Sequence, residues 1–190
     1  PQYDWQILTK RPELVADRLP PDWGEGWAHV WLGVSIENRR FVHRADLLRE
    51  MPAAVRFISA EPLLGPLVPG VAGFQPNLGD YGQEHALGEW YWPDGKLVDE
   101  EERPPLDLTS IDWLIAGGES GPGHRPMQEE WVRDLRDWTH AVDPRGDRLY
   151  STAFFFKQWG GAKPTSGGRE LDGRTWSEFP DTSTRKEAVR

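Results

Sequence analysis

The sequence predicts an α/β fold built on a parallel sheet of about five strands with helices outside. Five short apolar runs end in polar or charged residues, at 5–9, 30–35, 55–59, 112–116 and 152–157. Unbroken apolar runs are typical of strands covered on both faces, as in a parallel sheet. The first three runs begin at residues 5, 30 and 55, which leaves room for a connecting helix in each interval.

Helical patterns occupy the intervals between the runs. A short helix is expected near Pro12, because proline suits a first helical turn, and Pro20 ends it. Residues 38–51 predict a second helix with Asn38 as its N-cap and one apolar stripe, formed by Phe41, Ala45 and Leu48. A third helix is predicted over 128–142, with a stripe formed by Trp131, Leu135, Trp138 and Val142.

Two stretches depart from this alternation. Residues 66–110 are rich in proline, glycine and acid, and we interpret them as a loop insertion within a domain that spans 1–160. The insertion is either a solvated surface excursion or a lid whose aromatic residues, Trp90, Tyr91 and Trp92, stack on a substrate. Residues 161–190 are interpreted as a polar C-terminal tail.

The composition of the 190 residues argues against several classes of function. A net charge of −9 argues against general nucleic-acid binding, although a local basic patch remains compatible with it. The absence of cysteine excludes disulfides, thiolate metal sites and a cysteine nucleophile, and no His/Asp/Glu spacing predicts a metal site. No run is long and apolar enough to cross a membrane and no signal peptide is visible, so a cytoplasmic location is expected.

Polar residues that follow the predicted strands define the candidate site. The carboxyl ends of parallel strands meet at one edge of a sheet, where α/β folds bind ligands. Three carboxylates and three cations gather there, a set that suits a zwitterionic or phosphorylated ligand, and Arg125 lies just beyond. The candidate residues are Lys10, Arg11, Ser35, Glu37, Asn38, Ser59, Glu61, Glu119, Ser120, Lys157 and Gln158.

The carboxylates and Lys157 have a structural and a catalytic interpretation. Glu119 follows Gly117 and Gly118, which allow a sharp turn or a close approach to a ligand, and it is the strongest candidate. Lys157 forms either a structural ion pair with Glu61 or Glu119, or a carboxylate–lysine cluster for acid–base chemistry. Glu37 and Glu61 either cap backbone amides or belong to the site.

The cations after the first strand favour an anionic ligand. Lys10 and Arg11 precede a predicted helix start, where the helix dipole disfavours positive charge. A ligand that carries negative charge would explain why two cations occupy this position. His124 lies among glycines and prolines, and we interpret it as a surface residue.

Longer motifs carry a family resemblance. They are Leu-Thr-Lys-Arg-Pro (8–12), Trp-Leu-Gly-Val-Ser-Ile-Glu-Asn (31–38), Phe-Ile-Ser-Ala-Glu-Pro-Leu-Leu-Gly-Pro (57–66), Gly-Gly-Glu-Ser-Gly-Pro (117–122), Phe-Phe-Lys-Gln-Trp-Gly (155–160) and Gly-Arg-Glu-Leu-Asp-Gly-Arg-Thr-Trp (168–176). Together they resemble a phage and prophage protein family of unknown function that is similar to radical-SAM enzymes.

The resemblance implies a partial (β/α) barrel of about five strands and a cofactor. Members of this family are expected to use S-adenosylmethionine and a [4Fe–4S] cluster held by three upstream cysteines. This chain has no cysteine, so the resemblance implies a C-terminal part that is completed by a missing N-terminal barrel segment. The sequence starts at Pro1, without a methionine, and we expect the chain to be a fragment or a processed product.

The resemblance also assigns roles to the candidate residues. Cofactor binding is expected of Gly117, Gly118, Glu119 and Ser120, and catalysis of Glu119, Glu61 and Lys157. Substrate binding is expected of Lys10, Arg11, Ser35, Glu37, Asn38, Ser59 and Gln158.

Three functions therefore stay open at this point. The first is the C-terminal part of a radical-SAM-like enzyme that modifies nucleic acid or nucleotides. The second is a non-catalytic nucleic-acid- or protein-binding module on the same barrel scaffold. The third is a structural or partner-binding fragment, for which Glu119→Gln and Lys157→Ala would leave every measurable property of the protein intact.

Overall fold

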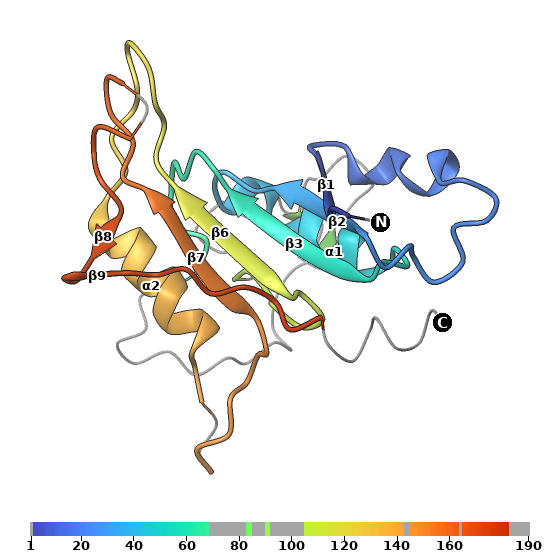
Figure 1. The fold of residues 1–190 in the computed structure, drawn as a ribbon. Helices are drawn as coiled ribbons and strands as arrows, with labels where there is room; N and C mark the ends of the chain where they lie inside the picture. The colour runs from blue at the N-terminus through green and yellow to red at the C-terminus, as the bar shows by residue number, and fades with distance from the viewer. Residues whose placement is uncertain are drawn as a thin grey trace.

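The fold is organised around one five-stranded parallel sheet (Figure 1). The computed structural model describes residues 2–68, 83–84, 90–91, 105–142, 145–163 and 165–182. The sheet order follows the chain: β1 (Trp5–Thr9), β2 (Val30–Ser35), β3 (Val55–Ala60), β6 (Trp113–Gly117) and β7 (Ala153–Gln158). This confirms the predicted α/β fold with five parallel strands. Within the described residues the sheet is open, with β1 and β7 at opposite edges.

The helices between the strands are shorter than the sequence predicts. The predicted helix near Pro12 consists of two 3₁₀-helices, Pro12–Leu14 and Ala16–Arg18. The predicted helix over 38–51 divides into a 3₁₀-helix, Arg39–Phe41, and α1, His43–Arg49. The third is α2, Glu129–Thr139, and Val142 lies beyond it with an exposed side chain. The spacing of apolar residues does not show at which residue a helix ends, because the terminal turns can lose their intrahelical hydrogen bonds.

The main core lies between the sheet and the helices α1 and α2. Leu114 and Phe154 are fully buried on this face of the sheet. Ala45 of α1 and Leu135 of α2 belong to the same cluster. Trp138 of α2 is also buried there, and its indole N–H donates to the carbonyl of Leu106 at 2.9 Å. Apart from the exposed Val142, the residues of the predicted apolar stripes therefore lie in or against this core.

The opposite face of the sheet carries a second, aromatic cluster. Trp31, Phe57 and Trp113 are buried side by side on neighbouring strands, and Phe155 of β7 packs against them. The Phe57 ring fills the space above Gly33, where an added Cβ would lie 2.3 Å from the ring. This face of β2, β3, β6 and β7 is therefore also covered by packed side chains.

The segment that follows the β8–β9 hairpin runs along the free edge of β7. The hairpin strands are Glu170–Leu171 and Arg174–Thr175, and residues 176–179 form what we call the C-terminal strap. The N–H of Phe156 donates to the carbonyl of Trp176 at 3.0 Å, and the N–H of Glu178 donates to that of Phe154 at 3.1 Å. The strap therefore covers the β7 edge in antiparallel orientation and crosses the sheet in Figure 1.

The strand β1 differs from the prediction of a buried strand. Its side chains are mostly exposed, with 63% exposure for Trp5 and 51% for Ile7. The reason is its position, since β1 pairs with β2 alone and forms an edge of the described sheet. An apolar run gives the composition of a strand but not the number of its neighbours.

The predicted insertion begins and ends in the core. Leu67 and Leu106 are fully buried, and the N–H of Leu106 donates to the carbonyl of Leu67 at 3.0 Å. Between them, β4 (Gln83–Glu84) pairs with β5 (Trp90–Tyr91) in antiparallel orientation. Insertion residues 69–82, 85–89 and 92–104, Trp92 included, lie outside the described residues. None of the helices in the described ranges has both the length and the apolar content that crossing a bilayer requires.

Candidate functional site

The carboxyl ends of the strands are joined by backbone hydrogen bonds into one surface. The loop after β3 connects its two neighbours, because the N–H of Leu63 donates to the carbonyl of Gly117 and the N–H of Leu64 donates to that of Glu37, at 2.9 and 2.8 Å. The polar residues after β2, β3 and β6 are thereby held together at one edge. We call this region the strand-end site.

Glu61 and Lys157 meet across the strand-end site. Their side chains form an ion pair of 2.9 Å between Nζ and Oε1, and the hydroxyl of Ser59 donates to the other carboxylate oxygen at 3.1 Å. Gly117 makes room for this carboxylate, since an added Cβ would lie 2.9 Å from Oε1 of Glu61. Ser59 and Glu61 from the end of β3 and Lys157 from the end of β7 are thus brought into one cluster.

Glu37 lies between two cations. The exposed ammonium of Lys10 pairs with its Oε1, and the guanidinium of Arg44 donates to its Oε2 at 3.1 Å. The Glu37 side chain is only 9% exposed. Arg44, which comes from α1 and not from a strand end, escaped the sequence-based reasoning. The signal that it left is its place seven residues after Glu37, on the helix that follows β2.

Glu119 is held by Arg125 in a two-pronged ion pair. Nη2 of Arg125 donates to Oε1 at 2.7 Å and Nε donates to Oε2 at 2.8 Å, and the backbone N–H of Arg125 also donates to Oε2. The hydrogen bonds from the Arg125 side chain, followed by that from its backbone, lower the pKa of Glu119 to about 2. Glu119 is therefore an ionised carboxylate near neutral pH and is not suited to donate a proton there.

We expect the Glu119–Arg125 pair to give the protein a stability term that depends on pH. The folded-state pKa of Glu119 lies below the ordinary value of 4.5, so this term is fully present above about pH 5 and is lost as the pH falls toward about 2. In Arg125→Gln the Glu119 carboxyl should titrate close to its ordinary value, as measured by carboxyl ¹³C NMR. A midpoint that stays near 2 in Arg125→Gln would show that the guanidinium is not the cause.

The loops after β6 and β7 are clasped together beside Glu119. The N–H of Gly118 donates to the carbonyl of Gln158, and the N–H of Gly161 donates to that of Glu119, both at 2.9 Å. The amide of Gln158 donates to the hydroxyl of Ser120 at 2.8 Å. Ser120 and Gln158, predicted to bind cofactor and substrate, therefore bind each other and fix the two loops.

The remaining predicted residues have contacts of other kinds. Asn38 caps the 3₁₀-helix before α1, as predicted, because its Oδ1 accepts the N–H of Arg40 at 3.1 Å. Arg11 is exposed and pairs with Glu13. Ser35 is buried, and its carbonyl accepts from Arg44 at 2.7 Å. These contacts place Asn38 and Ser35 in the framework of the site.

One pattern is common to the three carboxylates of the site: each is more buried than the strand-end or loop cation that it holds. Side-chain exposure is 9% for Glu37 and 59% for Lys10, 18% for Glu61 and 56% for Lys157, and 29% for Glu119 and 59% for Arg125. The carboxylates thus fix three cations whose side chains are more than half exposed.

These ion pairs are close enough to influence one another. The pKa of Arg125 is raised, mainly by its hydrogen bonds to Glu119, and the charge of Glu37 contributes to the same shift. The loop after β6 therefore lies within electrostatic range of the end of β2. Among the described residues, no group of His, Asp or Glu side chains is arranged to hold a metal ion.

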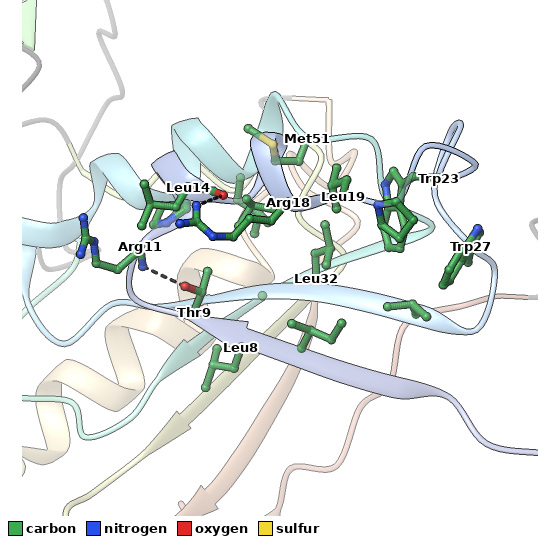
Figure 2. A pocket seen from close by; sticks show the side chains of 17 residues that line it. Leu8, Thr9, Arg11, Leu14, Arg18, Leu19, Trp23, Trp27, Leu32 and Met51 are labelled. Atoms are coloured by element: carbon green, nitrogen blue, oxygen red, sulfur yellow. Dashed lines mark hydrogen bonds between the residues drawn. The ribbon is translucent and has the colours of Figure 1, made fainter.

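An apolar cavity of about 500 Å³ lies beside β1 (Figure 2), and no residue of the three carboxylate ion pairs is among its lining residues. Leu8, Leu14, Leu32, Trp23 and Met51 are among its lining residues, and Arg11 lies at its rim. A cavity with such a lining suits apolar groups. We therefore place the binding of charged ligands at the strand-end site and not here.

Comparison with protein families gives a match over most of the chain. The model of the family DUF5131, described as a protein of unknown function, matches residues 1–180. No curated protein and no solved structure matches the chain.

Proposed function

The chain belongs to the DUF5131 family, whose function is unknown, and we propose from the geometry of its strand-end site that it binds the phosphate group of a nucleotide or nucleic acid. The observation that carries this proposal is the common pattern of buried carboxylates and exposed cations. Each carboxylate orients a cation whose side chain stays more than half exposed. Side chains that are held in place in this way lose little conformational freedom when they bind a ligand.

The donors at the site support an anionic ligand. An ammonium group carries three N–H donors, and within the described residues Glu61 is the one partner of Lys157 and Glu37 the one partner of Lys10. The remaining donors of both lysines can reach ligand oxygens. Charge-assisted hydrogen bonds of this kind are about twice as strong as neutral ones.

We expect nucleoside monophosphates to bind, and the corresponding nucleosides to bind much more weakly. Lys157→Gln should lower the affinity by about ten- to a hundredfold, because a hydrogen bond to a charged group contributes about 1.5–3 kcal/mol. Affinity should also fall as salt is added. Isothermal titration calorimetry measures each of these effects, and a single-stranded oligonucleotide tested in parallel distinguishes a nucleotide from a nucleic-acid substrate.

A matched control is Arg148→Gln. Arg148 is an exposed cation whose guanidinium binds the carbonyls of Thr139 and Thr152, near the amino end of β7. Removal of its charge should leave phosphate affinity unchanged. Equal binding of nucleosides with and without phosphate, or an equal loss in Arg148→Gln and Lys157→Gln, would contradict the proposal.

For the reaction, we propose the class that the family resemblance implies. The chain would be the C-terminal part of a cytoplasmic phage-type radical-SAM-like protein that modifies a nucleotide or nucleic acid. S-adenosylmethionine and a [4Fe–4S] cluster supply radical chemistry in such proteins. This chain has no cysteine and cannot ligate the cluster, so the proposal assigns the cluster to an N-terminal barrel segment.

The mixed charges of the strand-end site are compatible with a zwitterion such as S-adenosylmethionine. The proposed contacts for this cofactor are Gly117, Gly118, Glu119 and Ser120. Both carboxylate oxygens of Glu119 already accept hydrogen bonds from Arg125. The residues of this chain would bind and orient the reactants. Anaerobic reconstitution of the full-length gene product with iron and sulfide should produce the visible absorbance of a cluster. A full-length product that binds nucleotides but no iron would instead be a non-catalytic binding module.

A further inference from the structure

The three ion pairs of the strand-end site differ in their balance of charge. Glu61 holds one cation, Lys157, and Glu119 holds one, Arg125. Glu37 contacts two cations, Lys10 and Arg44, so this group of three side chains carries a net positive charge. We call it the Glu37 triad.

The two cations of the Glu37 triad have different surroundings. The Arg44 side chain is 12% exposed, donates to the carbonyl of Ser35 at 2.7 Å and lies over the ring of Phe41 at 4.1 Å. Arg44 is therefore held by three separate contacts, the one to Glu37 included. The Lys10 side chain is 59% exposed, and its one partner in the described chain is Glu37.

This difference decides which cation is available to a ligand. The guanidinium of Arg44 is fixed and nearly buried beside the nearly buried Glu37 carboxylate, so it neutralises most of the negative charge of Glu37. The ammonium of Lys10 then keeps its attraction for an external anion, whereas the Lys157 and Arg125 charges are each balanced by their own carboxylate. We infer that the phosphate binds at Lys10 and that Arg44 is a positioning residue that neutralises Glu37. This inference rests on the proposed function.

The inference gives substitutions of opposite sign within one triad. Arg44→Gln removes the surplus charge, so phosphate affinity should fall about tenfold even though Arg44 does not touch the ligand. Glu37→Gln leaves both cations and removes the opposing charge, so affinity should rise about tenfold. Lys10→Gln should lower affinity at least tenfold. A triad whose only role was structural would give no increase in Glu37→Gln.

In the experiment, each variant is titrated with inorganic phosphate while NMR monitors the lysine ammonium or ε-methylene signals. In the wild type, the Lys10 signal should shift and saturate with phosphate. Arg49→Gln is the matched control, since Arg49 also lies on α1 and pairs with carboxylates, those of Asp46 and Asp107. Its phosphate affinity should equal that of the wild type. Thermal unfolding establishes that each variant is folded, and if Arg44→Gln is not, Glu37→Gln and Lys10→Gln decide the question.

The outcomes separate this inference from the proposed function. In one outcome the wild type binds phosphate and Lys157→Gln weakens binding, while Arg44→Gln and Glu37→Gln leave the affinity unchanged. The assignment of the phosphate to Lys10 is then wrong, whereas phosphate binding by the protein is supported. If the wild type binds no phosphate at low salt, both are wrong. An affinity that falls in Glu37→Gln would also overturn the inference, because the carboxylate would then be acting as a ligand-holding group.

Discussion

Replacing Trp113 by alanine is expected to lower the free energy of unfolding by about 3–5 kcal/mol, the range for deleting a large buried aromatic side chain. Trp113 is 4% exposed and lies at the centre of the aromatic cluster. Its ring centroid lies 5.9 Å from that of Trp31, 5.8 Å from that of Phe155 and 5.2 Å from that of Phe179. The indole N–H also donates to the carbonyl of Glu178 at 2.9 Å.

The same substitution should release the C-terminal strap. Trp113 contacts the strap twice, through its N–H at Glu178 and its ring at Phe179. Urea unfolding measures the loss of stability, and limited proteolysis measures exposure of residues 176–179. Trp113→Phe is the control, because it keeps a ring and loses one hydrogen bond, which contributes about 1 kcal/mol. Equal losses in Trp113→Ala and Trp113→Phe would show that ring packing is not what holds this face.

The second large effect is expected at Gly118. An added Cβ would lie 1.9 Å from the carbonyl oxygen of Trp159, which belongs to the backbone of the adjoining loop. That oxygen cannot move unless the end of β7 moves with it. Gly118→Ala should therefore destabilise the protein by about 2–3 kcal/mol, as overpacking does in other proteins. It should also displace Glu119 from Arg125 and raise the pKa of Glu119 toward its ordinary value.

Gly65→Ala is the matched control for this substitution. The nearest atom to an added Cβ at Gly65 is Cβ of Asn38, at 3.3 Å, so a small adjustment relieves the contact. We expect a change of less than about 1 kcal/mol in urea unfolding. A loss in Gly118→Ala as small as that in Gly65→Ala would contradict the proposed clasp between the loops.

The strands could be predicted because most of them are buried on both faces. In β2, all six residues are buried, and in β6 all five are, so an unbroken apolar run identifies each strand. The exposed strand β1 has a similar apolar run. Burial there depends on what pairs with its free edge, which its own residues do not encode. The strap escaped prediction because residues 176–179 contain no unbroken apolar run, and the backbone hydrogen bonds that join them to β7 leave no pattern in the sequence.

The candidate site could be predicted in outline but not in its pairing. The convergence of strand ends is a property of parallel sheets, so Glu61 and Lys157 could be placed near each other before the structure was known. Which cation meets which carboxylate depends on side-chain reach from loops and helices. Arg44 reaches Glu37 from α1, and Arg125 reaches Glu119 from a glycine-rich loop. Neither distance can be derived from strand patterns.

The most direct test of phosphate binding at the strand-end site is a map of where phosphate binds. Backbone amide NMR signals of the wild-type protein would be followed as inorganic phosphate is added at low salt. We expect the shifts to be concentrated at Lys10, at residues 117–120 and at Lys157, with little change at the amino ends of the strands. Shifts confined to the apolar cavity beside β1, or no saturable shifts at all, would contradict it.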